Sequence, residues 1–312
     1  MDVFRTLTPS AGDSAVALGN FDGLHIGHQK VISLALDSAS EGLLPTVLTF
    51  AENPLVALGG RAGGRLLSQE DKIALLEQMG VRQLYILDFP TVKDLSAEEF
   101  VDRILVGGLK AKRACCGFNF TFGRGGKANS ETLSGLCGTR GLGISVAQAV
   151  LVDGTPVSST RIRGLLETGR AAEAARLLGR PFGYRVPVCR GKRLGHSLGT
   201  PTLNQNLPAG FVQPKFGVYA TRVHVEGKQY VGVTNIGVKP TVGSDYPLSE
   251  TWMPDYLGAE LYGKTVRVEL LRFLRPERKF PTLEALRDAI VRDGARAEEF
   301  FRRSQSAGRL NL

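Results

Sequence analysis

The sequence contains little cysteine and no long hydrophobic run. Its four cysteines, at positions 115, 116, 137 and 189, show no regular spacing and no neighbouring histidine cluster, so we expect neither a disulfide framework nor a zinc site. This pattern favours a reducing, cytoplasmic setting. No stretch of about 18 apolar residues occurs, and the N-terminus lacks the basic and apolar regions of a signal peptide. We therefore expect neither secretion nor a membrane-spanning helix.

Internal repeats, low-complexity linkers and long runs of one charge are also missing. The formal net charge is +9, and it is uneven: residues 1–180 hold 19 basic and 18 acidic side chains, whereas residues 181–312 hold 20 and 12. Because the basic residues are dispersed, the pattern argues against binding along a nucleic-acid backbone. Binding of small anionic substrates would account for the same excess of basic residues, and so would an ordinary solvated surface.

What is present is the composition of a soluble globular protein, with 43% hydrophobic and 22% charged residues. A length of 312 residues predicts two domains, each large enough to bury its own core. The two halves of the chain also differ in the secondary structure that their sequences predict.

The first half alternates between strand-like and helical segments. Apolar runs at 15–21, 45–50, 83–89 and 113–117 alternate with helical patterns at 29–39, 69–79 and 97–106. This alternation predicts a parallel sheet covered by helices on both faces. We therefore expect an α/β, Rossmann-like nucleotide-binding domain over residues 1–182, which ends in helices near 161–178.

The second half is rich in short β-prone segments, separated by Gly and Pro turns. These segments are 184–190, 217–227, 228–238 and 265–274, and a final helix follows the plausible N-cap Thr282. The pattern predicts a small antiparallel β-barrel with a terminal helix over residues 183–312. We place the boundary between the domains within 179–185.

The first motif, GNFDGLHIGH, lies where the first strand gives way to its helix. Glycines let a phosphate approach the backbone, and the start of a helix offers unpaired N–H groups and a positive dipole end. Ordinary turn histidines in a tight connection are the alternative, but so many specified positions rarely coincide by chance. The residues concerned are Gly19, Phe21, Asp22, Gly23, His25, Gly27 and His28.

This motif resembles the H-x-G-H signature of nucleotidyltransferases, and its extended form resembles the adenylyltransferase module of bacterial FAD synthetases. The segments CGFNFTFG (116–123) and SSTRIR (158–163) are similar to two further motifs of that family. The resemblance implies that FMN attacks ATP, that Phe50 and Asn119 lie on the flavin side, and that His25 and His28 are catalytic. It implies that ATP and pyrophosphate are held by Gly19, Phe21, Asp22, Gly23, His25, His28, Ser159, Thr160 and Arg163.

One departure concerns the segment after the second predicted strand. Family members carry F-x-P-H-P there, whereas this chain has Phe50-Ala51-Glu52-Asn53-Pro54. Asn53 replaces the motif histidine, and Glu52 adds a negative charge where two anionic substrates should meet. An alternative therefore stays open, in which the chain is a riboflavin kinase with an inactive or altered adenylyltransferase domain.

The second motif is a glycine-punctuated loop, with Gly191, Gly195 and Gly199, that leads to Pro201-Thr202-Leu203-Asn204. It resembles the Gly-rich loop and P-T-A-N motif of riboflavin kinases. The resemblance implies that the glycines cover ATP phosphates and that the oxygens of Thr202 and Asn204 bind Mg²⁺, which prefers such ligands. The alternative for this stretch alone is a β-turn set by Pro201.

Further segments of the second half are similar to the same kinase family. They are 216–219, 232–237 with Pro240-Thr241, Glu250-Thr251 and 261–264. The resemblance implies that Glu250 is the base that accepts the proton of the attacking hydroxyl; the alternative is an ordinary surface strand residue. His196, Thr200 and Leu203 depart from the motif, and we expect Arg275 and Lys279 to form surface ion pairs.

These observations predict a bifunctional bacterial FAD synthetase. It would phosphorylate riboflavin to FMN and adenylylate FMN to FAD, with ATP as co-substrate and Mg²⁺ as cofactor in both steps. No nucleic acid or membrane is expected as a partner, and the oligomeric state stays open. A regulatory flavin-binding or RNA-binding protein without turnover is the competing class of hypothesis.

Overall fold

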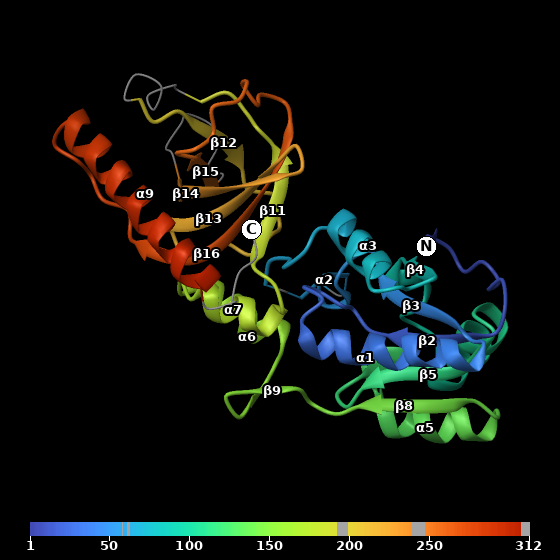
Figure 1. Cartoon of the computed structure of the whole chain (residues 1–312). Helices are drawn as coiled ribbons and strands as arrows, with labels where there is room; N and C mark the ends of the chain where they lie inside the picture. The colour runs from blue at the N-terminus through green and yellow to red at the C-terminus, as the bar shows by residue number, and fades with distance from the viewer. Residues whose placement is uncertain (58, 61–62, 192–198, 239–246, 307–312) are drawn as a thin grey trace. The chain divides into compact units, whose positions relative to one another are not determined.

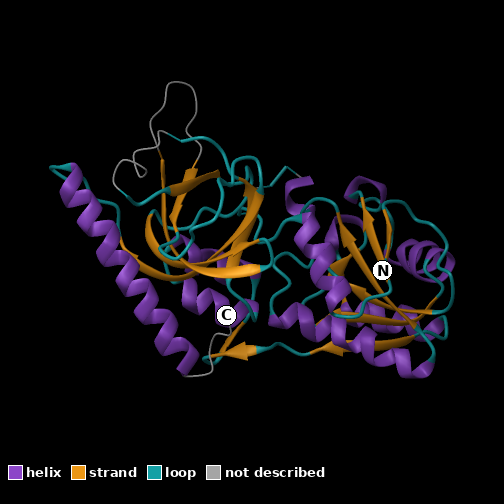
Figure 2. Ribbon diagram, turned by 45° about the horizontal axis from the view of Figure 1, so that its top comes forward, coloured by secondary structure: helices purple, strands orange, loops and turns teal. Residues whose placement is uncertain are grey.

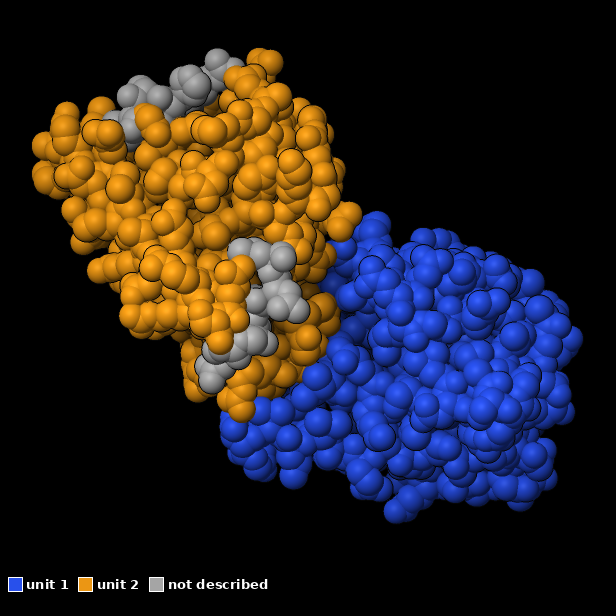
Figure 3. Space-filling view, viewed as in Figure 1, with its two compact units in different colours: residues 1–63, 67–159 blue, residues 64–66, 160–312 orange. Residues whose placement is uncertain are grey.

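The chain forms two compact units. The computed structural model describes all residues except 58, 61–62, 192–198, 239–246 and 307–312. The first unit comprises residues 1–63 and 67–159, and the second comprises residues 64–66 and 160–312 (Figure 3). Two helices before the β-rich segment, α6 (Ser159–Glu167) and α7 (Ala171–Leu178), fall almost wholly within the second unit. The functional limits 1–182 and 183–312 stay predictions.

The first unit is built on a six-stranded parallel sheet, as expected (Figure 1). Its order is β1-β4-β3-β2-β5-β8, and the two edge strands β1 and β8 were not expected from the sequence. Two small hairpins, β6–β7 and β9–β10, flank it. The bounds are β1 Asp2–Phe4, β2 Ser14–Leu18, β3 Leu44–Phe50, β4 Gln83–Leu87, β5 Ala111–Gly117, β6 Thr121–Phe122, β7 Ala128–Asn129, β8 Gly143–Ala147, β9 Leu151–Val152 and β10 Thr155–Pro156.

Helices cover both faces of this sheet (Figure 2). Successive strand residues point to opposite faces, so Ala15 and Ala17 of β2 join one buried core, and Val16 and Leu18 join the other. The first core includes α1 (Ile26–Asp37) and α3 (Gln69–Gln78); the second includes η3 (Phe100–Gly108) and α5 (Ser130–Thr139). Shorter helices are η1 (Ser38–Glu41), α2 (Pro54–Ala57), η2 (Phe89–Thr91), α4 (Ala97–Glu99) and η4 (Arg124–Gly126).

The helix expected over 97–106 differs in kind. Only α4 is α-helical, begun by a capping box between Ser96 and Glu99, and η3 is a π-helix. Its wider turn is visible where the Leu109 N–H donates to the Ile104 carbonyl, five residues back, at 2.9 Å. Over so short a segment, α- and π-helices bury nearly the same positions, so hydrophobic spacing could not distinguish them.

The order of the strands marks where a ligand can bind. From β2 the chain adds β3 and β4 on one side and then crosses to β5 and β8 on the other. In open α/β sheets, ligands bind outside the carboxyl ends of the strands at such a switch point. Here that point lies beyond Leu18 of β2 and Gly117 of β5.

The second unit contains a six-stranded antiparallel sheet. This confirms the antiparallel β-domain that the sequence predicted, and the expected small barrel takes the form of a curled half-barrel. Its order is β11-β16-β13-β14-β15-β12, and a β-bridge between Cys189 and Asn204 links the two ends of the sheet. The terminal helix α9 (Leu283–Ser306) packs on β13 and β14, and the Thr282 hydroxyl caps it by accepting the Ala285 N–H at 3.1 Å. The strand bounds are β11 Phe182–Pro187, β12 Thr202–Asn206, β13 Gly217–Val225, β14 Lys228–Val238, β15 Pro247–Trp252 and β16 Thr265–Arg275.

The interior of the half-barrel is partly polar. The buried hydroxyls of Thr221, Thr234 and Thr251, from three adjacent strands, form a chain of hydrogen bonds at 2.9 and 2.8 Å. Gln205 is also buried and donates to the carbonyls of Val186 and Val266 at 2.7 and 2.9 Å. These bonds tie the strands together across the curl.

A buried carboxylate, Glu269 of β16, is surrounded by basic side chains. Arg222 and Arg267 donate to it at 2.7 and 2.9 Å, and His224 Nε2 lies 3.2 Å from Oε2. Burial opposes ionisation, but contact with His224 and the charges of both arginines prevail and lower the pKa of Glu269 to about 2. The cluster therefore stabilises the folded unit whenever Glu269 is ionised.

We expect the Glu269→Gln variant to lose roughly 3 kcal/mol of unfolding free energy at neutral pH, because both arginines lose their counter-charge. The folded-state pKa lies below its ordinary value of 4.5, so this contribution is complete above pH 4.5 and is lost as pH falls toward 2. The difference from wild type should therefore shrink over that range. Urea unfolding followed by fluorescence of Trp252, the sole tryptophan, reports on this unit.

Glu173→Gln provides the matched control in the same unit. Glu173 pairs with Arg170 on the surface of α7, where water and salt screen the attraction and the pair contributes little to stability. Equal losses for Glu269→Gln and Glu173→Gln at neutral pH would contradict the stabilising role of the buried cluster.

Candidate active sites

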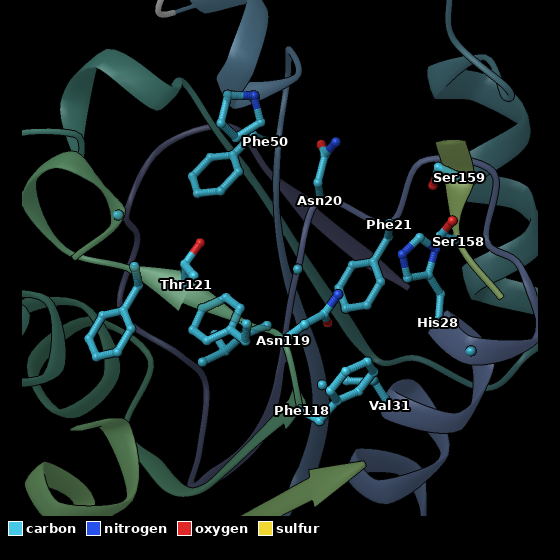
Figure 4. Close-up of a pocket in the computed structure, with 18 of the residues that line it drawn as sticks. Asn20, Phe21, His28, Val31, Phe50, Phe118, Asn119, Thr121, Ser158 and Ser159 are labelled. Carbon is cyan, nitrogen blue, oxygen red and sulfur yellow. The ribbon is translucent and has the colours of Figure 1, made fainter. Parts of the chain in front are cut away.

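A cavity of about 670 Å³ opens in the first unit at the carboxyl ends of its strands. Its lining comes from the segments that follow β2, β3, β5 and β8, which is the switch point of the sheet. Figure 4 shows His28, Ser158 and Ser159 together at one side of this cavity, with Phe50 and Thr121 at the other. The cavity thus has a polar end and an aromatic end.

The polar end is formed by the start of α1. His25 is the N-cap of the helix, and its Nδ1 accepts the backbone N–H of His28 at 3.2 Å. The two imidazoles stack with ring centroids 3.5 Å apart, and Phe21 meets His28 edge-on. The capping bond and the stack therefore fix both rings beside the free N–H groups of the helix start.

His28 is held as a neutral imidazole. Burial lowers its pKa well below the usual value, and the nearby His25 and Lys72 lower it further. Its Nδ1 is buried and has no hydrogen-bond partner among the residues that the structure describes. A neutral imidazole can donate one hydrogen bond to a phosphate oxygen without changing charge near neutral pH.

The structure brings most of the expected residues of the first unit together. Ser159 donates to the Asp22 carbonyl at 2.9 Å, which joins the segment 158–163 to the first motif. Asp22 and Gly23 shape the turn and do not line the cavity, and Gly23 has a φ of 81°. The expected residues that line it are Gly19, Phe21, His25, Gly27, His28, Phe50, Asn119, Ser158 and Ser159.

Two expected residues of the ATP site fall in the other unit. Thr160 and Arg163 lie on α6, and Arg163 Nε donates to the Gly64 carbonyl at 2.7 Å within the second unit. Their contact with ATP stays a prediction.

The aromatic end is a wall of phenylalanines from four different segments. Phe50 meets Phe89 edge-on, with the ring centroids 5.3 Å apart. The ring centroid of Phe122 lies 5.3 Å from that of Phe100 and 5.6 Å from that of Phe120. Flat rings in this arrangement provide stacking surfaces for a planar ligand. Phe50 was expected here from the sequence, whereas Phe89 and Phe100 were not, because no local motif marks them.

The two residues at which the chain departs from the family's F-x-P-H-P motif, Glu52 and Asn53, lie in different places. Asn53 lines the cavity and its Oδ1 accepts the Leu55 N–H at 3.0 Å, so it also caps the short helix α2. Glu52 is exposed and is not among the lining residues. The negative charge that raised the question of an impaired adenylyltransferase therefore lies outside the cavity.

We expect Glu52→Gln to change kcat/KM for FAD formation from FMN by less than about twofold, because an exposed charge is screened by salt. Asn53→Ala should have the larger effect, since it removes both the lining amide and the cap of α2. Steady-state assays of both variants measure this. A large gain in Glu52→Gln would restore the electrostatic interpretation of the departure.

The second unit places three polar side chains in one row across the sheet. Glu250 of β15 is the register partner of Asn204 on β12 and of Asn235 on β14, so the three share one face. Asn235 donates to Glu277 at 3.0 Å. Asn235 had no expected role, because its position beside Glu250 follows only from the strand register.

The residues at Asn204 fit a hard cation. Asn204 is buried, and its Oδ1 has no hydrogen-bond partner among the described residues, although an unmet buried acceptor costs free energy. Thr202 precedes it by two residues, so both side chains lie on the same face of β12. Neutral oxygens beside a carboxylate, completed by ATP phosphates, match the sites that Mg²⁺ prefers.

The glycines of the loop have distinct positions. At Gly191 a Cβ would lie 2.6 Å from the Asn204 amide, so only glycine fits against that side chain. Gly199 has a φ of 69°, which favours glycine. Gly195, with His196, Pro240 and Thr241, lies outside the described residues.

Arg275, the last residue of β16, has a structural role. Its Nε donates to Asp293 of α9 at 2.8 Å, which joins the sheet to the terminal helix. An ion pair was expected here, but Asp293 is buried, so the pair does not lie on the surface as expected. Lys279 has no ion pair among the described residues, and its expected surface pair stays a prediction.

Comparison with known proteins matches both halves of the chain. The family described as FAD synthetase matches residues 7–161, and the family described as riboflavin kinase matches residues 178–301. The bifunctional riboflavin kinase/FMN adenylyltransferase of Bacillus subtilis is 36% identical over 92% of each chain. The proteins of the same name from Pseudomonas fluorescens and Escherichia coli K12 are 36% and 33% identical over 94% and 92% of each chain.

A solved structure shares the fold over nearly the whole chain. It is described as a macrolide-efflux protein from Streptococcus pneumoniae, and it matches with a TM-score of 0.87 and 29% identity, covering 96% of this chain and 99% of its own. In the described part of the present chain, no helix has both the length and the apolarity needed to cross a membrane. The sequence identity, its extent and the two family matches agree, and the chain belongs to the family of bifunctional riboflavin kinases/FMN adenylyltransferases.

Proposed function

We propose that residues 183–312 phosphorylate riboflavin to FMN, and that residues 1–182 adenylylate FMN to FAD with release of pyrophosphate. ATP is the co-substrate of both reactions. The observation that carries the proposal is that each unit has its own set of reactive side chains. The first has stacked His25 and His28 at a cavity, and the second has Asn204 paired in register with Glu250.

In the first domain, a phosphate oxygen of FMN attacks the α-phosphorus of ATP while the bond to pyrophosphate breaks. Such a transfer requires alignment and neutralisation of developing charge, and no protein nucleophile. His25, His28 and Ser159 would donate to the phosphates at the polar end. The family resemblance adds Thr160 and Arg163 to the ATP-binding residues of the proposal. The aromatic end would take the isoalloxazine ring, with Phe50 and Asn119 on the flavin side.

In the second domain, the primary hydroxyl of riboflavin attacks the γ-phosphorus of ATP and loses its proton, while the bond from that phosphorus to ADP breaks and ADP leaves. Glu250 would accept that proton, with Asn204 and Asn235 on either side of its strand. We propose Thr202 and Asn204 as ligands of Mg²⁺ and Gly191 and Gly199, with Gly195, as the cover of the phosphates. When bound, Mg²⁺ would neutralise phosphate charge.

The test is to incubate the purified protein with riboflavin, ATP and MgCl₂ and to separate riboflavin, FMN and FAD over time. FMN followed by FAD supports both assignments. FMN alone would leave a riboflavin kinase with an inactive first domain. Tight flavin or RNA binding without any product would favour a regulatory protein.

We further infer that the protein works in the cytoplasm, where ATP is available. All four cysteines are free, and burial raises the pKa of Cys115 to about 12 and that of Cys116 to about 11, so both stay protonated. Neither nucleic acid nor a membrane has a role in the proposed reactions.

A further inference from the structure

Lys72 of α3 is a buried cation behind the polar end of the cavity. Its exposed fraction is 6%, and lysine is almost never buried this deeply without a specific partner. It does not line the cavity and belongs to none of the motifs that identify the family. Its surroundings nevertheless connect it to two parts of the adenylyltransferase site.

The first connection is to the turn that follows β2. The Asn20 carbonyl accepts from Lys72 Nζ at 3.0 Å and from the Thr49 hydroxyl at 2.9 Å. The turn is strained, because Phe21 and Leu24 have φ values of 51° and 43°, a region that costs such residues free energy. Bonds from α3 and β3 to one carbonyl therefore hold the turn that carries Asn20 and Phe21 into the cavity.

The second connection is electrostatic. The ionisable groups that act on the His28 ring are His25, from the cap of α1, and Lys72, from α3. Phe21 contacts the ring edge-on and carries no charge. Both Lys72 and His25 oppose protonation of His28.

We propose that Lys72 is a positioning residue for adenylyl transfer: it holds the β2–α1 turn through Asn20 and supplies a positive field at His28. The inference rests on the function proposed above for the first domain. His28 then donates a hydrogen bond as a neutral group, while Lys72 adds positive charge near the polar end of the cavity. A purely structural lysine would hold the turn and leave the pH dependence of the reaction unchanged.

The experiment compares Lys72→Met and Lys72→Arg with wild type. We expect Lys72→Met to lower kcat for FAD formation from FMN roughly tenfold, less than the 10²- to 10³-fold typical of a donor that touches the reacting oxygens. Its acid limb in kcat/KM should move to higher pH, because His28 then protonates more readily. Lys72→Arg keeps the charge, so we expect it to keep the wild-type acid limb.

Two controls separate charge from folding. Lys30→Met removes an exposed lysine from α1 and should leave both the rate and the pH profile unchanged. The riboflavin kinase rate of each variant reports whether the second domain is intact. An unchanged acid limb and kcat in Lys72→Met would overturn the proposal.

A measurement without turnover covers the case in which Lys72→Met fails to fold. NMR titration of the four histidines in wild-type protein, with His28 identified by its variant, should show His28 neutral well below pH 6.5. A His28 that titrates at or above pH 6.5 overturns the proposal. Because this readout needs no substrate, it also distinguishes failure of the inference from failure of the assigned reaction.

Discussion

The Glu250→Gln variant should phosphorylate riboflavin about 10²- to 10⁴-fold more slowly than wild type, while it converts supplied FMN to FAD at the wild-type rate. Glutamine has the shape of glutamate but cannot accept the proton of the attacking hydroxyl. Since Glu250 lies in a regular strand between Asn204 and Asn235, the substitution should not disturb the register. Initial rates of FMN formation measure the effect.

The matched control is Glu260→Gln, which removes an exposed carboxylate from the same unit. It should leave both rates within about twofold of wild type. If Glu250→Gln forms FMN as fast as Glu260→Gln does, Glu250 is not the base, and the proton must leave by another route.

The opposite separation is expected for His28→Ala. FAD formation from FMN should fall about 10²- to 10³-fold, because a fixed donor to the phosphates is lost together with its stack on His25. Riboflavin phosphorylation should continue at the wild-type rate, since the second unit holds its own reactive set. The two rates, measured on one preparation, test this separation.

Ser33→Ala serves as the control on the same helix, because the Ser33 hydroxyl only donates to the Lys30 carbonyl at the surface. It should form FAD normally. Wild-type adenylylation by His28→Ala would remove His28 from the catalytic set, and a parallel loss of kinase activity would indicate a general folding defect.

The parallel sheet was largely predictable because its central strands are buried on both faces. The residues of β2 and β4 are buried throughout, and after the polar first residues Ser14 and Gln83 each strand appears in the sequence as an apolar run. The edge strands lack that signal: β1 is only three residues long, and β8 begins with an exposed glycine. Pairing with a neighbouring strand, rather than their own composition, makes them strands.

The half-barrel was predictable only in part because its interior contains polar groups. Strands β12 and β15 bury Gln205, Ser249 and Thr251 instead of aliphatic residues. The alternation of apolar and polar positions that indicates a half-buried strand is therefore weak in both. Their cross-strand partners supply the missing information, and these come from distant parts of the sequence.

In the candidate sites too, local motifs could be recognised from the sequence, whereas contacts between distant segments could not. Motifs identified His25, His28 and Glu250, because the required groups lie in short segments. Lys72 meets Asn20 across 52 residues, and no local pattern marks that contact. The sequence also could not show that Asn53 lines the cavity while its neighbour Glu52 does not.

The residue that caps α1 makes the start of this helix less stable than it could be. Serine, threonine, aspartate or asparagine normally begin a helix, yet His25 occupies this position with its ring nitrogen as the acceptor. A shorter polar side chain at position 25 would favour the helix and remove the imidazole on which the proposed chemistry depends. Selection for thermal stability alone would therefore favour replacement of His25 and yield an inactive protein. Stabilised variants that still make FAD must owe their higher stability to substitutions elsewhere in the chain.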